Sequence, residues 1–242
     1  MIRAEESAQN YFKYKSRIDE LCKESGKWEE GVNLLCATKT VSGERINEIR
    51  ALTGLDLIGE NRVQELLEKY DVLDKEGLRI HFIGKLQSNK VKYIIDKVDM
   101  IESLDSLSLA AEIDRQARKH GIVMDVLVEI NIGREKEKSG IMPEETGEFL
   151  KALSEYPAIR VRGLMTVAPR CDTRQERIEY FEKMRNIFVD ASKMELHNAD
   201  MSYLSMGMTQ SYEEGILCGA NIVRVGSGIF GERDYSQIEK SE

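Results

Sequence analysis

The chain has 242 residues, of which 41% are hydrophobic and 32% are charged, and its formal net charge is −8. This length suits one large domain or two small ones, and the acidic balance argues against a nucleic-acid surface. Apolar runs stay below the roughly 20 residues that span a bilayer, and the N-terminus lacks a signal-peptide core, so we expect a cytoplasmic protein without a membrane anchor. The four cysteines and three histidines show no metal-ligand spacing, which predicts reduced thiols and no metal site.

Short β-rich runs alternate with longer amphipathic stretches along the chain. The first 25 or so residues mix charges at helical spacing and predict an extra N-terminal helix. Further helices are expected at 42–54, 61–73, 106–121 and 177–192, and Pro143 opens another. The predicted strands are 32–39, 55–60, 79–84, 100–105, 125–131, 159–166, 203–207 and 221–227.

Eight strands that each adjoin a helix indicate a parallel sheet covered by helices. At this length the pattern predicts a (β/α)8 TIM barrel with an extra N-terminal helix, and an open doubly wound sheet is the alternative. No repeat, low-complexity tract or linker divides the sequence, so we expect a single domain over 1–242.

Polar residues gather where the predicted strands end, whereas the strand bodies are apolar. In a barrel of this type the functional site lies at the C-terminal ends of the strands. The distribution therefore predicts a site at one end of the barrel. The residues concerned are Lys39, Asn61, the segment 84–90, Asn131, Thr166, Ser205 with Met206, and Gly226 to Gly228.

Side-chain alternation sharpens the prediction for two cations. Lys39 ends the first predicted strand, where a lysine is rarely left unless it is paired or neutral. Arg224 alternates with two flanking valines, so it points into the barrel if those valines meet the outer helices. The alternative is that both cations reach water at the strand ends or pair with Glu60 or Asp105.

The segment 226–231 reads GSGIFG and matches the glycine pattern of dinucleotide-binding loops. Only eleven residues follow it, too few for the helix, strand and acidic residue that a Rossmann site requires. A glycine-rich turn after the last strand of a barrel instead suits a phosphate site, in which backbone N–H groups bind the anion. The alternative is that the glycines serve only a tight turn.

Together, these features suggest pyridoxal 5′-phosphate (PLP) as the ligand. Desolvation favours the neutral amine of a lysine such as Lys39, which can then attack an aldehyde and form a Schiff base. An arginine such as Arg224 is a known partner for the pyridine nitrogen. Ser205 and the turn at Gly226 and Ser227 would take the phosphate.

The sequence resembles a known family in several motifs spread over residues 5 to 235. It is similar to the pyridoxal phosphate homeostasis proteins, single-domain relatives of the N-terminal barrel of alanine racemase. The small departures, Ser227 where many members have threonine and Thr209 where many have serine, keep the hydroxyl groups. The motifs are CATKTV, IGENRVQE, HFIGKLQSNK, VEINIGREKEKSG, GLMTVAP and LSMGMTQSYEEGILCGANIVRVGSGIFGERDY.

The resemblance implies a role for each candidate site residue. It implies that Lys39 forms the covalent aldimine and that Arg224 contacts the pyridine nitrogen. It places the phosphate around Ser205, Met206, Gly226 and Ser227, and it puts Asn61 and Met165 along the cofactor. The 134–140 loop also matches the family, but it could equally be a solvated run of charges.

The resemblance further implies PLP binding and a role in cellular PLP balance, without an established catalytic activity. We expect no second domain of the kind that completes the active site of alanine racemase. Arg224 stays protonated and would leave the pyridine nitrogen unprotonated, which weakens the ring as an electron sink. We therefore expect a monomeric carrier or regulator whose recipients are apo-PLP enzymes. A small PLP-dependent racemase and a barrel that binds another phosphorylated ligand are the alternatives.

Overall fold

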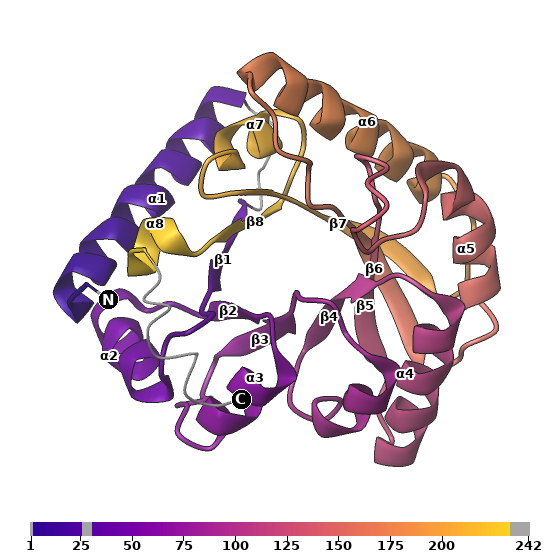
Figure 1. Ribbon diagram of the computed structural model, residues 1–242, viewed down its shortest axis with the longest axis horizontal. Coiled ribbons are helices and arrows are strands. Elements are labelled where there is room, and N and C mark those ends of the chain that lie inside the picture. The colour runs from indigo at the N-terminus through magenta and orange to yellow at the C-terminus, as the bar shows by residue number, and fades with distance from the viewer. Residues whose placement is uncertain (1, 26–30, 233–242) are drawn as a thin grey trace.

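The structure is a computed structural model that describes residues 2–25 and 31–232, so residues 1, 26–30 and 233–242 of the expected domain lie outside the described residues. Eight parallel strands pair in chain order and close into a barrel, with β1 against β8 (Figure 1). The predicted TIM barrel is confirmed, and the doubly wound alternative is wrong. The strands are β1 Asn33–Ala37, β2 Leu57–Glu60, β3 Arg79–Phe82, β4 Met100–Leu104, β5 Met124–Glu129, β6 Ile159–Met165, β7 Ala199–Met208 and β8 Ile222–Val225.

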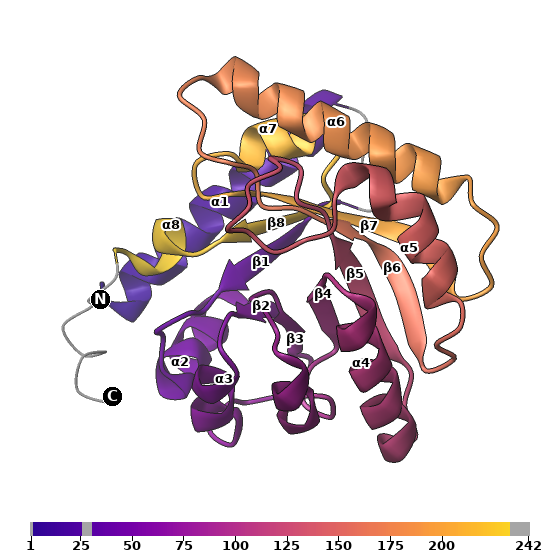
Figure 2. The same cartoon turned by 45° about the vertical axis from the view of Figure 1, so that its right-hand side comes forward.

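Helices surround the barrel as an outer layer, and the extra N-terminal helix α1 lies beside α2, α7 and α8 (Figures 1 and 2). None of the helices in the described part of the chain is long and apolar enough to cross a membrane. The α-helices are α1 Ala4–Ser25, α2 Gly43–Thr53, α3 Val63–Tyr70, α4 Leu107–His120, α5 Thr146–Leu153, α6 Arg174–Ser192, α7 Tyr212–Leu217 and α8 Ser227–Phe230, and the 3-10 helices are η1 Ser88–Tyr93 and η2 Pro143–Glu145.

The apolar core has two layers, as the alternation of strand side chains requires. The larger layer lies between the strands and the helices, and it contains Val223 and Val225 from β8. The smaller layer fills the barrel interior and consists of Leu35, Leu57, Met100, Leu127, Met165 and Ile222.

Local sequence signals explain most element boundaries. The Ser106 hydroxyl accepts a hydrogen bond from the Leu109 N–H and starts α4. Gly121 ends α4 at φ 68°, a conformation that few residues other than glycine adopt. Several strand predictions need correction. The strands expected at 32–39, 79–84, 125–131 and 221–227 each end two residues early, and the strand expected at 203–207 already begins at Ala199.

Candidate functional site

A cavity of about 640 Å³ lies at the C-terminal ends of the strands, where the sequence predicted the site. Its wall contains four of the eight residues predicted to bind the cofactor, Asn61, Arg224, Gly226 and Ser227. The remaining wall residues come from the end of β1, the segments after β3 and β6, the end of β7 with the loop that follows it, and α6. They are Ala37, Ile83, the segment 166–172, Arg177, Phe181 and the segment 207–211.

Arg224 points into the barrel, as the alternation of β8 predicted, and only 5% of it is exposed. Its Nη1 donates to the Ser205 hydroxyl at 2.5 Å, and its Nη2 donates to the Thr166 carbonyl oxygen at 2.8 Å. These contacts hold the guanidinium between β6 and β7 at the floor of the cavity. For this residue, the alternative of a solvated strand end is wrong.

A chain of hydrogen bonds continues from Ser205 across the barrel. The Ser205 hydroxyl donates to Glu102 Oε2 at 2.6 Å, and Glu102 Oε1 lies 2.7 Å from His81 Nδ1. Burial would raise the pKa of Glu102, but the His81 bond, the charges of His81 and Arg224 and the Ser205 bond together lower it. Burial also lowers the pKa of Arg224, against the carboxylates of Glu102 and Glu129. The barrel interior thus holds a carboxylate and a guanidinium joined by one hydroxyl.

Lys39 lies in a turn beyond β1, so it does not continue the strand as the sequence predicted. The turn is closed by the Val41 N–H, which donates to the Thr38 carbonyl oxygen at 3.0 Å. Thr40 adopts φ 65°, an uncommon conformation for threonine, and its N–H donates to Glu65 Oε2 at 3.0 Å. Non-glycine residues in such conformations concentrate at functional sites. Lys39 is half-buried, and the preceding β1 residue Ala37 lines the cavity.

A buried ion pair, which was not predicted from the sequence, contacts the turn through the carbonyl oxygen of Thr38. Lys69 of α3 donates to Glu60 Oε1 at 2.9 Å and to the Thr38 carbonyl oxygen at 3.0 Å. The Thr38 hydroxyl also donates to Glu60 Oε1. Glu60 is completely buried and Lys69 is 6% exposed, so each is the principal counter-charge of the other. This pair fixes the residue that precedes Lys39.

Replacing Lys69 with methionine is expected to lower the free energy of unfolding by about 3 kcal/mol, because Glu60 would stay buried without its cation. Chemical denaturation of the apo-protein measures the loss. Burial raises the pKa of Glu60, so the loss should shrink as the pH falls and the carboxyl takes up a proton. Lys15→Met, at a lysine with an exposed side chain, is the control. If Lys69→Met lowered the free energy of unfolding as little as Lys15→Met, a stabilising role of the Lys69–Glu60 pair would be contradicted.

Lys39 is not among the residues that line the cavity, and three other predicted residues also lie outside its wall. Met165 belongs to the apolar layer inside the barrel, and Ser205 is completely buried with its hydroxyl on Arg224 and Glu102. Met206 points the opposite way, into the layer between strands and helices, which leaves its backbone as the part that can face the site. The hydroxyl groups that do line the cavity after β7 belong to Thr209 and Ser211.

Thr209 and Ser211 were not predicted as site residues, although they lie within the quoted motif that begins LSMGMTQS. The Gly226 N–H donates to the Thr209 hydroxyl at 3.4 Å, and the Met208 N–H donates to the Ser211 hydroxyl at 3.1 Å. The Gly226 contact joins the loop after β7 to the turn after β8. A pattern of hydroxyls and glycines in both loops is the signal that could have found them.

Comparison with known proteins decides the family. The family model for the alanine racemase N-terminal domain matches residues 22–234. The pyridoxal phosphate homeostasis protein of Aquifex aeolicus (strain VF5) is 44% identical over 219 residues, which cover 90% of this chain and 95% of that protein. The chain belongs to the pyridoxal phosphate homeostasis protein family. The Escherichia coli K12 member of the family is 34% identical over 234 residues, covering 95% of this chain and 98% of that one.

Solved structures agree with this assignment. PipY of Synechococcus elongatus PCC7942, solved with PLP bound, has 29% sequence identity and a TM-score of 0.80, and the match covers 93% of this chain and all of PipY. Alanine racemase from Corynebacterium glutamicum has a TM-score of 0.70 at 16% identity, with 62% of its chain covered, which shows the shared barrel fold. The resemblance predicted from the motifs is confirmed, and the relatives are named as homeostasis proteins rather than as enzymes.

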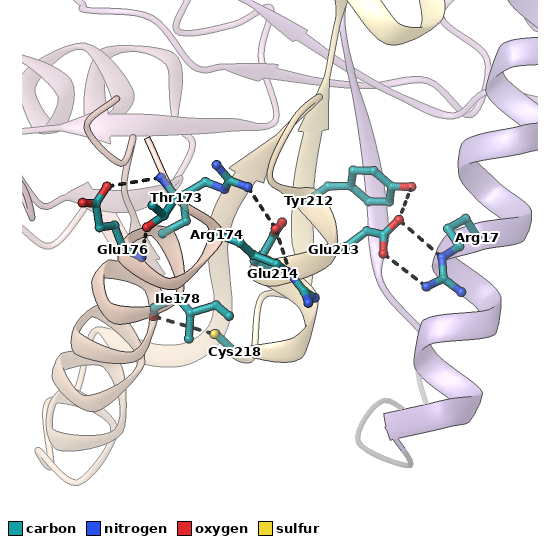
Figure 3. A network of polar contacts seen from close by, with 10 residues as sticks. Arg17, Thr173, Arg174, Glu176, Ile178, Tyr212, Glu213, Glu214 and Cys218 are labelled. Carbon is teal, nitrogen blue, oxygen red and sulfur yellow. Dashed lines mark hydrogen bonds and ion pairs between the residues drawn. The ribbon is translucent and has the colours of Figure 1, made fainter. Parts of the chain in front are cut away.

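Ion pairs fasten the loops that form the cavity wall of this family member. Glu214 of α7 accepts from Arg174 and Arg177 of α6, each at 3.2 Å (Figure 3). On its other side α7 is joined to α1, because Arg17 binds Glu213 at 3.1 Å. Since α6 and α7 each follow a cavity loop, these contacts hold the segments 166–172 and 207–211 in place.

Glu214→Gln is expected to cost about 2 kcal/mol of unfolding free energy, because the carboxylate is largely buried and serves two guanidinium groups. Urea denaturation measures the loss, and amide hydrogen exchange should become faster in the segment 207–211. Glu213→Gln is the matched control, because its arginine pair is more exposed and should matter less. Equal effects of the two substitutions would contradict a specific role for Glu214.

The 134–140 loop folds back over the end of β5. The Ser139 hydroxyl donates to Glu129 Oε1 at 2.9 Å, and the Asn131 amide donates to the Glu135 carbonyl oxygen at 2.9 Å. Burial raises the pKa of Glu129, which lies near the barrel mouth. The loop is therefore more than a solvated run of charges.

No cluster of histidine, cysteine and acidic side chains suited to a metal ion occurs in residues 2–25 and 31–232.

Proposed function

We propose that this protein binds PLP in the cavity at the C-terminal end of its barrel and takes part in PLP homeostasis as a carrier. The observation that carries the proposal is the guanidinium of Arg224, held rigidly at the floor of that cavity. Membership in a family with a PLP-bound structure, that of PipY, supports it. Lys39, in the strained turn after β1, would bind the cofactor aldehyde as a Schiff base.

Two glycines and two hydroxyl groups in the cavity wall suit the phosphate of the cofactor. Gly226 lies against β1, where a β-carbon would come within 3.3 Å of the Ala37 carbonyl oxygen. Gly207 adopts φ 93°, so its loop needs a glycine. Between these glycines stand the hydroxyl groups of Thr209 and Ser227, which suit a phosphate together with backbone N–H groups.

Within this proposal each site residue has its own task. Arg224 would donate to the pyridine nitrogen, and Asn61 would line the ring on the β2 side. Gly226 and Ser227 would take the phosphate, joined by Thr209 and by the backbone at Met206. Met165 and Ser205 would form the floor on which Arg224 rests.

The chemistry of Arg224 favours a carrier over an enzyme. PLP supplies an aldehyde for reversible attachment and an electron-accepting ring. A permanently charged guanidinium at the ring nitrogen keeps that nitrogen unprotonated, which weakens the electron sink needed for carbanion chemistry. We infer a single-domain monomer that works in the cytoplasm and delivers PLP to apo-PLP enzymes.

Reconstitution tests this function. The apo-protein is mixed with PLP, freed of excess ligand by gel filtration, and added to an apo-PLP enzyme whose activity reports delivery. We expect about one PLP per chain and recovery of enzyme activity. Absence of uptake would contradict PLP binding, and a robust Lys39-dependent racemisation of amino acids would replace the carrier role with a racemase.

A further inference from the structure

We propose that Glu102 is a positioning residue of the cofactor site, acting through Ser205 to hold Arg224 in the orientation that receives the pyridine ring. This inference rests on the proposed function. Glu102 lies in the middle of the buried strand β4, where no sequence pattern predicted a functional residue.

The geometry joins four strands in one line. His81 on β3 contacts Glu102 on β4 at 2.7 Å, Ser205 on β7 donates to the other oxygen of Glu102 at 2.6 Å, and Arg224 on β8 donates to Ser205 at 2.5 Å. Both carboxylate oxygens of Glu102 make hydrogen bonds, and Glu102 and Ser205 are completely buried. Glu102 is therefore held from two sides.

The hydrogen-bond directions leave a single arrangement. An ionised carboxylate only accepts hydrogen bonds, so the one proton of the Ser205 hydroxyl points to Glu102. Ser205 can then only accept from Arg224, which fixes Nη1, while the Thr166 carbonyl oxygen fixes Nη2. A carboxamide at position 102 could donate to Ser205 and turn its proton toward the guanidinium.

The charges around Arg224 also support a positioning role for Glu102. Arg224 is buried, and the carboxylates whose charges act on it are those of Glu102 and Glu129. Burial raises the pKa of Glu129, whereas hydrogen bonds and neighbouring charges lower the pKa of Glu102, so Glu102 keeps its negative charge to lower pH than Glu129 does. Without it, the guanidinium would be drawn toward the water of the cavity and would lose its preorganised position.

The hydrogen-bond chain ends with His81 near the N-terminal ends of the strands, opposite the cofactor cavity. His81 lines a cavity of about 140 Å³ among residues at the starts of the strands. The charged side chains there are Arg79, Asp99, Asp125 and Arg162. Glu102 lines neither this cavity nor the cofactor cavity, so its role is to orient Arg224 rather than to touch the ligand.

The test combines a measurement on the apo-protein with one on PLP binding. A double-mutant cycle uses Glu102→Gln, Arg224→Met and the double variant, and thermal unfolding of each apo-protein is recorded. We expect strong coupling, with the double variant less destabilised than the sum of the single ones. Additive effects would overturn the pairing of Glu102 with Arg224, whether or not the protein binds PLP.

PLP titration then tests positioning. Glu102→Gln is expected to weaken PLP binding about tenfold, the effect of losing one charge-assisted contact. It should also move the acid–base midpoint of the bound chromophore to lower pH, because removal of a negative charge destabilises a nearby cation. Glu112→Gln, at a half-buried glutamate of α4 that pairs with the exposed Arg115 outside the barrel, is the control and should change neither.

A second variant covers the case in which Glu102→Gln does not fold. Ser205→Ala keeps both charges and removes the hydroxyl that joins them, and it should weaken PLP binding several-fold. Unchanged affinity and an unchanged chromophore midpoint in the folded variants would overturn the positioning role. Failure of the wild-type protein to bind PLP would instead contradict the proposed function, and the apo-protein cycle would still decide the pairing.

Discussion

The Lys39→Ala variant is expected to stay colourless after incubation with PLP, because the side chain that would bind the aldehyde is gone. Non-covalent contacts from Arg224 and the phosphate loops would remain, so weak binding should persist. We expect the affinity to fall by about 100-fold or more, equivalent to about 2.7 kcal/mol. Visible absorbance and a fluorescence titration measure the two effects.

The control for this variant is Lys15→Ala, on the exposed face of α1. It should keep the colour and the affinity of the wild-type protein. The fold should tolerate Lys39→Ala, because the buried lysine beneath the turn is Lys69. Full colour and unchanged affinity in Lys39→Ala would show that another amine binds the aldehyde.

Arg224→Met is expected to produce the largest loss of stability, about 3–5 kcal/mol of unfolding free energy. It removes a buried guanidinium that bonds Ser205 and Thr166 and whose charge acts, together with that of His81, on the buried Glu102 carboxylate. PLP affinity should fall as well, since the ring nitrogen loses its partner. Denaturation of the apo-protein and PLP titration measure the two effects separately. Arg115→Met on the exposed face of α4 is the control.

The pH dependence of the same variant provides a further check. The pKa of Glu102 is lower in the folded protein than its usual 4.5, so its stabilising contribution is present above pH 4.5 and is lost as the pH falls through the folded value. In Arg224→Met the part of this contribution that comes from Arg224 is lost, while the His81 contact stays, so the difference in stability from wild type should be largest at neutral pH and should narrow in acid. A constant difference across this range would contradict the charge pairing.

The barrel was predictable because its signals are local. Eight apolar runs, each next to an amphipathic stretch, gave the strand number and the parallel order, and the capping residues Ser106 and Gly121 bounded α4 closely. The inward direction of Arg224 followed from alternation, since neighbouring valines belong to the outer layer. The end of β1 was not predictable, because alternation continues in the sequence through Lys39 while the backbone already turns at Thr38.

The hydrogen bonds that complete the site could not be predicted from local sequence patterns, because they join residues far apart in the chain. Ser205 and Glu102 are 103 positions apart, and Lys69 meets the Thr38 carbonyl across 31 positions. Neither strand order nor periodicity says which inward side chains of β4 and β7 meet, since that depends on the stagger of the closed barrel. Met206 shows the same limit, because its motif suggested a site residue while its side chain packs against the helices.

Borohydride reduction followed by peptide mapping tests covalent PLP binding at Lys39 most directly. The purified protein is saturated with PLP, reduced, digested and analysed by mass spectrometry. We predict that the colour is bleached and that the pyridoxyl group is found on the peptide containing Lys39. An adduct confined to other lysines such as Lys69 or Lys85, or no adduct at all, would contradict the site proposed here.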